Sequence, residues 1–131
     1  MRTDQHDTDR VLATVAFACR PDTVAEARSW ATKLYALAGG AVPDACELLV
    51  SEVATNAVLH AGGPEYTVSV LNDLSIAVWD SSSAMPQKRA TDEESTCGRG
   101  LELLELLAPG YEVVPDEAQG GKTIRFTPKG W

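Results

Sequence analysis

Two short alternating runs, separated by only two residues, constrain the fold of this chain more than any other feature of its sequence. Residues 66–71 (YTVSVL) and 74–79 (LSIAVW) both have the composition and alternation typical of β-strands. Asn72 and Asp73, which separate them, tolerate the positive φ that a tight hairpin demands. Because so short a connection joins only antiparallel neighbours, the sequence predicts an antiparallel pair of strands.

The remaining periodic segments are predicted in the order strand, helix, helix, hairpin, loop, helix, strand, strand. Residues 11–17 alternate as in a strand, and residues 24–38 carry apolar side chains at three- and four-residue steps, as in an amphipathic helix. A leucine-rich segment at 101–107 predicts a further helix. Residues 111–114 and 124–126 predict two final strands, joined by a polar loop that contains glycine.

This order of elements predicts a fold of the α+β class. Antiparallel connections dominate it, so we expect a mixed, mostly antiparallel sheet with helices on one face. Residues 1–9 have the polarity of a flexible tail, and residues 10–131 are expected to form a single domain. Residues 81–97 lose all periodicity and fill with polar side chains, which is typical of a functional lid in a compact domain.

The charge and the cysteines of the chain narrow the classes of function. With 11 Lys and Arg against 19 Asp and Glu, the net charge of −8 repels a phosphate backbone, so nucleic-acid binding is not expected. Cys19, Cys46 and Cys97 are odd in number and lack a C-x-x-C spacing, which favours reduced thiols in a cytosol. The apolar stretch at 11–19 is too short for a membrane span, so we expect a soluble, cytoplasmic protein.

A second helix, predicted over residues 44–61 from a capping box at its start, carries a polar stripe. Glu52, Asn56 and His60 follow one another at four-residue steps and therefore share one face. Such a stripe taken alone is most often a solvated surface. Because Thr55 and its neighbours extend the polar or small character around the helix, the stripe also fits the border of a cleft.

A glycine-bearing turn at residues 98–101 (GRGL) opens the leucine-rich helix. Backbone N–H groups at the positive end of a helix, unobstructed by side chains, can meet a phosphate closely. The signal is weak by itself, and the chain lacks both the P-loop and the full G-x-G-x-x-G pattern. Arg99 has two open roles, since it fits a phosphate contact as well as a surface ion pair with Glu94 or Glu102.

Two further segments carry candidate ligand-binding residues. Asp80 ends a hydrophobic strand, where its carboxylate could accept from the exocyclic amine of adenine or could simply close the strand in an Asx-turn. The segment Gly120-Gly121-Lys122-Thr123 leads into the last strand, and Thr123 could add a hydroxyl beside the base. Taken alone, that second segment is also a good hairpin turn.

Together, the four segments resemble the N, G1, G2 and G3 boxes of GHKL ATPases, in order and in spacing, over nearly the whole chain. They are residues 52–56 (EVATN), 79–83 (WDSSS), 98–101 (GRGL) and 120–123 (GGKT). The short length and the phrase SEVATNAVLHA at 51–61 resemble most the bacterial anti-sigma factor serine kinases. This resemblance implies a Bergerat fold, with ATP and Mg²⁺ as cofactors.

The resemblance also implies a role for each matching residue. Glu52 corresponds to the general base that takes a proton from a substrate serine or from water, and Asn56 to the residue whose amide oxygen holds Mg²⁺. Asp80 corresponds to the adenine-reading aspartate and Thr123 to the residue that supports it through water, while residues 81–97 correspond to the ATP lid. The implied nucleotide-binding residues are Asn56, Asp80, Ser82, Gly98, Arg99, Gly100, Leu101 and Thr123.

The G1 box departs from the family pattern. The usual D-x-G-x-G is replaced by residues 80–84 (DSSSA), so Ser82 stands where a glycine normally permits close approach to adenine. A serine forced into positive φ would cost about 1 kcal/mol in strain, which would weaken ATP binding, although a rearranged loop could avoid this cost.

Two hypotheses about function follow, from different classes. The first is a serine/threonine protein kinase acting in transcription regulation, which sequesters a sigma factor and phosphorylates a serine of an anti-sigma factor antagonist. The second, suggested by the degenerate G1 box, is a non-catalytic nucleotide-binding or nucleotide-free interaction module. A histidine-kinase subunit is not favoured, because neither His6 nor His60 has the setting of a phosphoacceptor, and His60 is assigned a structural role. Whether the domain forms a homodimer stays open.

Overall fold

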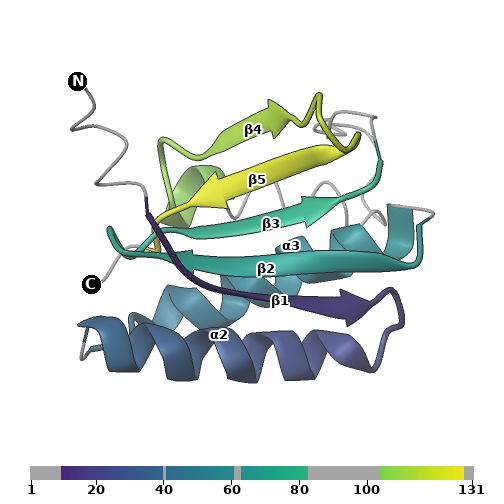
Figure 1. Ribbon diagram of the computed structural model, residues 1–131. Coiled ribbons are helices and arrows are strands. Elements are labelled where there is room, and N and C mark those ends of the chain that lie inside the picture. The colour runs from purple at the N-terminus through teal and green to yellow at the C-terminus, as the bar shows by residue number, and fades with distance from the viewer. Residues whose placement is uncertain (1–9, 40, 61–62, 83–103, 129–131) are drawn as a thin grey trace.

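An antiparallel sheet with helices on one of its faces makes up the fold (Figure 1). The computed structural model describes residues 10–39, 41–60, 63–82 and 104–128. In these residues the strands are β1 (Val11–Ala18), β2 (Glu65–Leu71), β3 (Ile76–Asp80), β4 (Glu112–Pro115) and β5 (Lys122–Phe126), in the spatial order β1-β2-β3-β5-β4. Every neighbouring pair is antiparallel, and the α+β prediction is confirmed.

The helices α2 (Thr23–Gly39) and α3 (Asp44–His60) both lie on the same face of the sheet (Figure 1). Their bounds agree with the sequence patterns to within one or two residues. Ala27, Ala31 and Tyr35 line the buried face of α2 at four-residue steps. Thr23 at its start joins the layers, because its hydroxyl is within 2.9 Å of the Tyr66 hydroxyl and also donates to the carbonyl of Ala18.

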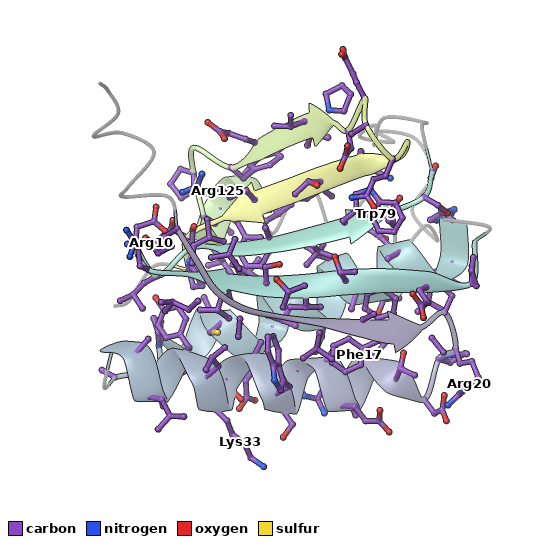
Figure 2. All side chains as sticks on the ribbon, in the orientation of Figure 1. Arg10, Phe17, Arg20, Lys33, Trp79 and Arg125 are labelled. Carbon is purple, nitrogen blue, oxygen red and sulfur yellow. The ribbon has the colours of Figure 1, made fainter. Side chains whose placement is uncertain are left out.

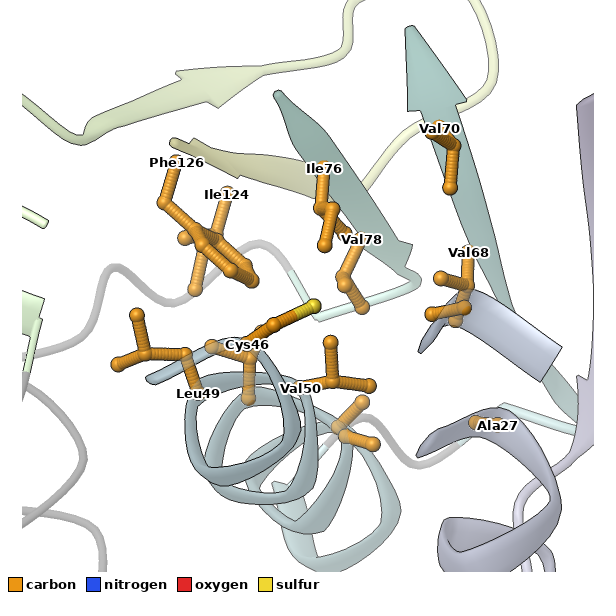
Figure 3. Close-up of a cluster of buried hydrophobic side chains, with 14 of the residues drawn as sticks. Ala27, Cys46, Leu49, Val50, Val68, Val70, Ile76, Val78, Ile124 and Phe126 are labelled. Atoms are coloured by element: carbon orange, nitrogen blue, oxygen red, sulfur yellow. The ribbon is translucent and has the colours of Figure 1, made fainter. Parts of the chain in front are cut away.

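Alternate residues of the central strands meet α3 to form the hydrophobic core, which Figure 3 shows. Residues 104–107 are also helical, and Leu104 is buried with this core. The side chains that face one another across the layers are Cys46, Leu49 and Val50 from α3, with Val68, Val70, Ile76, Val78, Ile124 and Phe126 from the sheet. None of the helices in the described ranges has the length and apolarity needed to cross a membrane.

The hairpin between β2 and β3 forms as expected, but its turn is longer than predicted. Asn72 and Asp73 were expected to carry the positive φ, whereas the residue that does so is Leu74, with φ of 68°. The Asp73 carboxylate accepts from both the backbone N–H of Ser75 at 3.0 Å and its hydroxyl at 2.6 Å. Because the N–H of Ser75 is used in this way, only its carbonyl pairs with β2, by accepting the N–H of Leu71 at 2.9 Å, and β3 begins at Ile76.

The contact between α3 and the sheet carries much of the stability, and Leu49 tests it. Replacing Leu49, which has no exposed surface, by Ala leaves a cavity in the core and should lower the free energy of unfolding by about 2–5 kcal/mol. Leu37→Ala on α2 is the matched control: Leu37 is 83% exposed, and its loss should change stability by no more than about 0.5 kcal/mol. Urea unfolding followed by circular dichroism measures both, and equal effects would contradict this assignment of the core.

Candidate functional site

Two of the candidate segments, the last turns of α3 and the end of β3, lie at one end of the sheet. Figure 1 shows the end of α3, the end of β3 and the beginning of β5 on the same side of the molecule. Glu52 and Asn56 lie on α3, and Asp80 is the last residue of β3. Four of the predicted residues, Gly98, Arg99, Gly100 and Leu101, lie outside the described residues, as does most of the predicted lid. The structure thus brings part of the predicted site to one edge.

Asp80 is buried, with 4% of its surface exposed. Both oxygens of its carboxylate accept hydrogen bonds. Its Oδ1 accepts the backbone N–H of Ser82 at 2.9 Å, which is the Asx-turn that the sequence left open as an alternative. Lys122 donates from Nζ to Oδ1 at 2.9 Å and to Oδ2 at 3.1 Å. Asp80 therefore closes the strand and forms a buried ion pair at the same time.

Lys122 is the residue that the sequence reasoning missed. It is the direct cross-strand partner of Asp80, and only 6% of its surface is exposed. The alternation along β5 could have revealed that Lys122 is buried. Lys122 precedes Ile124 and Phe126 by two and four residues, so it faces the core with them. A lysine at a position expected to be apolar needs a carboxylate partner.

Thr123 lies on the opposite face of the sheet from Asp80. It pairs with Trp79, and both belong to the half-buried positions that alternate with the core positions of their strands. Trp79 projects from the face away from the helices, and its Nε1 donates to the carbonyl of Gly120 at 2.8 Å (Figure 2). The structure therefore places Lys122, and not Thr123, next to the Asp80 carboxylate.

Two glycines hold the backbone close around the end of β3. Gly121 has φ of 82°, and a Cβ there would collide with the carbonyl of Asp80. A Cβ on Gly63 would collide with the hydroxyl of Ser81. The turn before β5 thus packs backbone against backbone on Asp80 and Ser81, which only glycine permits.

Ser82 does not carry the strain that its place in the G1 box suggested. Among the described residues other than glycine, only Leu74 has a positive φ. Ser82 instead donates its N–H to Asp80 in an ordinary Asx-turn. The departure from the glycine pattern is accommodated locally, without the cost expected for a left-handed serine.

Asn56 carries a buried acceptor that no described residue satisfies. Its Oδ1 is inaccessible to solvent and has no hydrogen-bond partner within the described chain. Leaving such a group unpaired costs about 1–3 kcal/mol, so a water molecule, a metal ion or a ligand that reached this oxygen would be stabilising. An amide oxygen is a ligand suited to Mg²⁺ or to a metal-bound water, and Asn56 therefore fits the magnesium role implied for it.

Glu52 lies one turn before Asn56 on the same face of α3, and both residues are half-buried. This stripe adjoins the buried face that contains Val53 and Ala57. The arrangement places a carboxylate and an amide at the border between core and solvent, where they can contact a ligand. His60, at the end of the same helix, is exposed.

The two cysteines in the described residues are free thiols. Burial raises the pKa of Cys46 to about 12. Burial, followed by the charges of Asp80 and Glu65, raises the pKa of Cys19. A raised pKa keeps a thiol protonated at neutral pH, which disfavours a nucleophilic role for either cysteine.

A surface hollow of about 340 Å³ is lined by residues that include Asp73, Glu112 and Arg125, and by none of the candidate residues. Arg125 donates to Asp73 at 2.6 Å and to the hydroxyl of Ser75 at 3.0 Å. These interactions tie the β2–β3 turn to β5, so we assign this hollow a structural role and place the candidate site at the Asp80 end.

Comparison with known proteins identifies a family for this chain. The family model described as a histidine kinase-like ATPase domain matches residues 17–127. The match extends from β1 to the residue after β5 and includes all the segments that carry candidate residues. A search among curated proteins gave no significant match.

The packing of Gly121 against β3 can be tested with Gly120 as its matched control. Both glycines have positive φ, but a Cβ at Gly120 meets nothing within 4 Å. Gly120→Ala should lower the free energy of unfolding by about 1 kcal/mol through backbone strain alone. Gly121→Ala should lower it by about 1–3 kcal/mol more, because the added methyl collides with Asp80. Thermal and urea unfolding measure the difference, and equal losses in the two variants would refute the close approach.

Proposed function

Because the chain belongs to the histidine kinase-like ATPase family, we propose that it binds ATP with Mg²⁺ and transfers the γ-phosphoryl group to a serine or threonine of a protein. The observation that carries this proposal is the buried, unpartnered Oδ1 of Asn56, at the position where the family resemblance implies a magnesium ligand. Glu52 one turn earlier supplies the carboxylate that phosphoryl transfer to a hydroxyl requires.

Each residue has a distinct task in this reaction. Asn56 would hold Mg²⁺ through its amide oxygen, and the metal, when bound, would supply neutralisation of the phosphate charge. Glu52 accepts the proton of the attacking hydroxyl, because a carboxylate at the border of the core is both accessible and positioned by its helix. Asp80 holds the adenine through its exocyclic amine, at the same end of the sheet as the C-terminal end of α3.

The negative charge of the nucleotide phosphates must be neutralised when they bind to this acidic chain. Its net charge of −8 opposes the approach of a nucleotide, so the metal is essential to binding as well as to transfer. Arg99 and the glycine turn at residues 98–101 are proposed to contact the phosphates, on the strength of the resemblance alone.

The partners are proposed from the resemblance to anti-sigma factor kinases. They are a sigma factor, which the protein sequesters, and an anti-sigma factor antagonist, whose serine accepts the phosphoryl group. With these partners, the proposed role is transcription regulation in the cytoplasm. The same resemblance leaves a homodimer as a further option.

A second candidate function is a protein-interaction module without catalysis. The observation that favours it is the ion pair of Asp80 with Lys122, since the carboxylate proposed to read adenine is already engaged by an ammonium group. If the ammonium excludes the base, the domain would capture a regulator without using ATP.

Substitution of Asn56 tests the proposal directly. Asn56→Leu removes the unpartnered acceptor while keeping the side-chain volume, so the free energy of unfolding of the ligand-free protein should rise by about 1 kcal/mol. The same change should abolish the Mg²⁺-dependent binding of ATP. Asn72→Leu, in the exposed hairpin at the other end of the sheet, should leave ATP binding unchanged. Urea unfolding and calorimetric titration with ATP, with and without Mg²⁺, measure the two effects, and full ATP binding by Asn56→Leu would count against the magnesium role.

Substitution of Glu52 separates catalysis from binding. Glu52→Gln should lower phosphoryl transfer from ATP by about 10²–10⁴-fold, since the general base is lost. The affinity for ATP should change little. Glu47→Gln, which lies on the exposed surface of the first turn of α3, should retain full activity. Transfer of labelled phosphate from ATP is the measurement, and undiminished turnover in Glu52→Gln would show that another group takes the proton.

A further inference from the structure

The ion pair of Asp80 and Lys122 has a hydrogen-bonding capacity that the described residues do not use. We propose that Lys122 is a base-reading residue, which donates from Nζ to the ring nitrogen N1 of adenine while Asp80 accepts from the exocyclic amine. This role of Lys122 rests on the proposed function, because it requires a nucleotide at this end of the sheet. It makes Lys122 a specificity-determining residue of the same site.

The Asp80 carboxylate has one acceptor position left. Oδ1 accepts from the N–H of Ser82 at 2.9 Å and from Nζ of Lys122 at 2.9 Å, which fills its two lone pairs. Oδ2 accepts only from Lys122, at 3.1 Å. No other hydrogen bond to this carboxylate is found in the described part of the chain, so Oδ2 retains a lone pair.

Lys122 has at least one donor left beside that lone pair. An ammonium group carries three N–H donors, and its two contacts to Asp80 engage at most two of them. Within the described ranges Lys122 has no further partner. A spare donor and a spare acceptor therefore lie next to each other in side chains that are 8% and 6% exposed. A ligand with one acceptor next to one donor could use both of these positions.

The backbone fixes the pair in place. Asp80 and Lys122 are direct partners in the β3–β5 ladder, so their Cα positions do not depend on flexible loops. Gly121 adds to this constraint, because its backbone packs against the carbonyl of Asp80. A donor and an acceptor held in this way are preorganised for a planar ligand edge that presents one acceptor and one donor.

Adenine presents such an edge, with the N1 acceptor next to the amine donor. Guanine presents one acceptor, O6, followed by two donors, N1–H and the 2-amino group. Its second donor would need a further acceptor, and Oδ1 of Asp80 is already filled by Ser82 and Lys122. A guanine base would thus bury an unpaired donor, which lowers its affinity.

The opposite possibility is that Lys122 only blocks Asp80. An ammonium group that competes with the base would make ATP bind more tightly when it is removed. A group that reads the base would make ATP bind more weakly when it is removed. The two roles therefore predict opposite signs for one substitution.

The test compares ATP with 1-deaza-ATP, in which a C–H replaces the N1 acceptor, by calorimetric titration in the presence of Mg²⁺. The wild type should bind 1-deaza-ATP about tenfold more weakly or worse, because a hydrogen bond from a charged donor is lost. Lys122→Met should bind ATP more weakly than the wild type and should bind the two nucleotides within about twofold of each other, since nothing is left to read N1. Lys33→Met, on the side of α2 that points away from the sheet in Figure 2, should behave as the wild type does.

The outcomes separate the two proposals. Equal affinity of the wild type for ATP and 1-deaza-ATP would overturn the role of Lys122 and leave ATP binding intact. Tighter ATP binding by Lys122→Met would also overturn it, in favour of a blocking role. Absence of ATP binding by the wild type would overturn the proposed function and the role of Lys122 together. The comparison on the wild type needs no variant, so it decides the matter even if Lys122→Met does not fold.

Discussion

The packing of α3 on the sheet is the interaction on which the rest of the structure depends. Cys46, Leu49 and Val50 fill the space beneath β2, β3 and β5, and this contact fixes the rotation of the helix about its axis. Once the apolar side of α3 faces the sheet, the polar stripe through Glu52 and Asn56 must lie at the border of the core. Close packing thereby positions the residues proposed for catalysis and for metal binding.

The fold was predictable because its signals are local. The α3 bounds came from a capping residue and a regular period, and the hairpin came from two alternating runs with a short connection. The position of the positive φ was wrong, because it depends on how Asp73 caps Ser75, and such side-chain bonds are not visible in a pattern of hydrophobicity. Local periodicity thus predicts which elements form more reliably than how they begin and end.

The site was predictable only in part, for a different physical reason. Asn56 and Asp80 could be proposed because each lies at a recognisable place in its own element. The contact between Asp80 and Lys122 joins residues 42 positions apart, and it follows from the register between β3 and β5. The motif suggested Thr123, and not Lys122, as the neighbour of Asp80. The alternation of a strand turns these two adjacent residues to opposite faces, and the motif alone does not include it.

The register between β3 and β5 also determines how costly a misaligned sheet would be. If β5 slipped by one residue against β3, Lys122 would turn outward into solvent and Thr123 would turn inward beside a carboxylate stripped of its counter-charge. The misaligned sheet would bury an isolated negative charge, which is a severe penalty in an apolar interior. The charged pair therefore disfavours the shifted register, and the same register places the groups proposed to read the base next to each other.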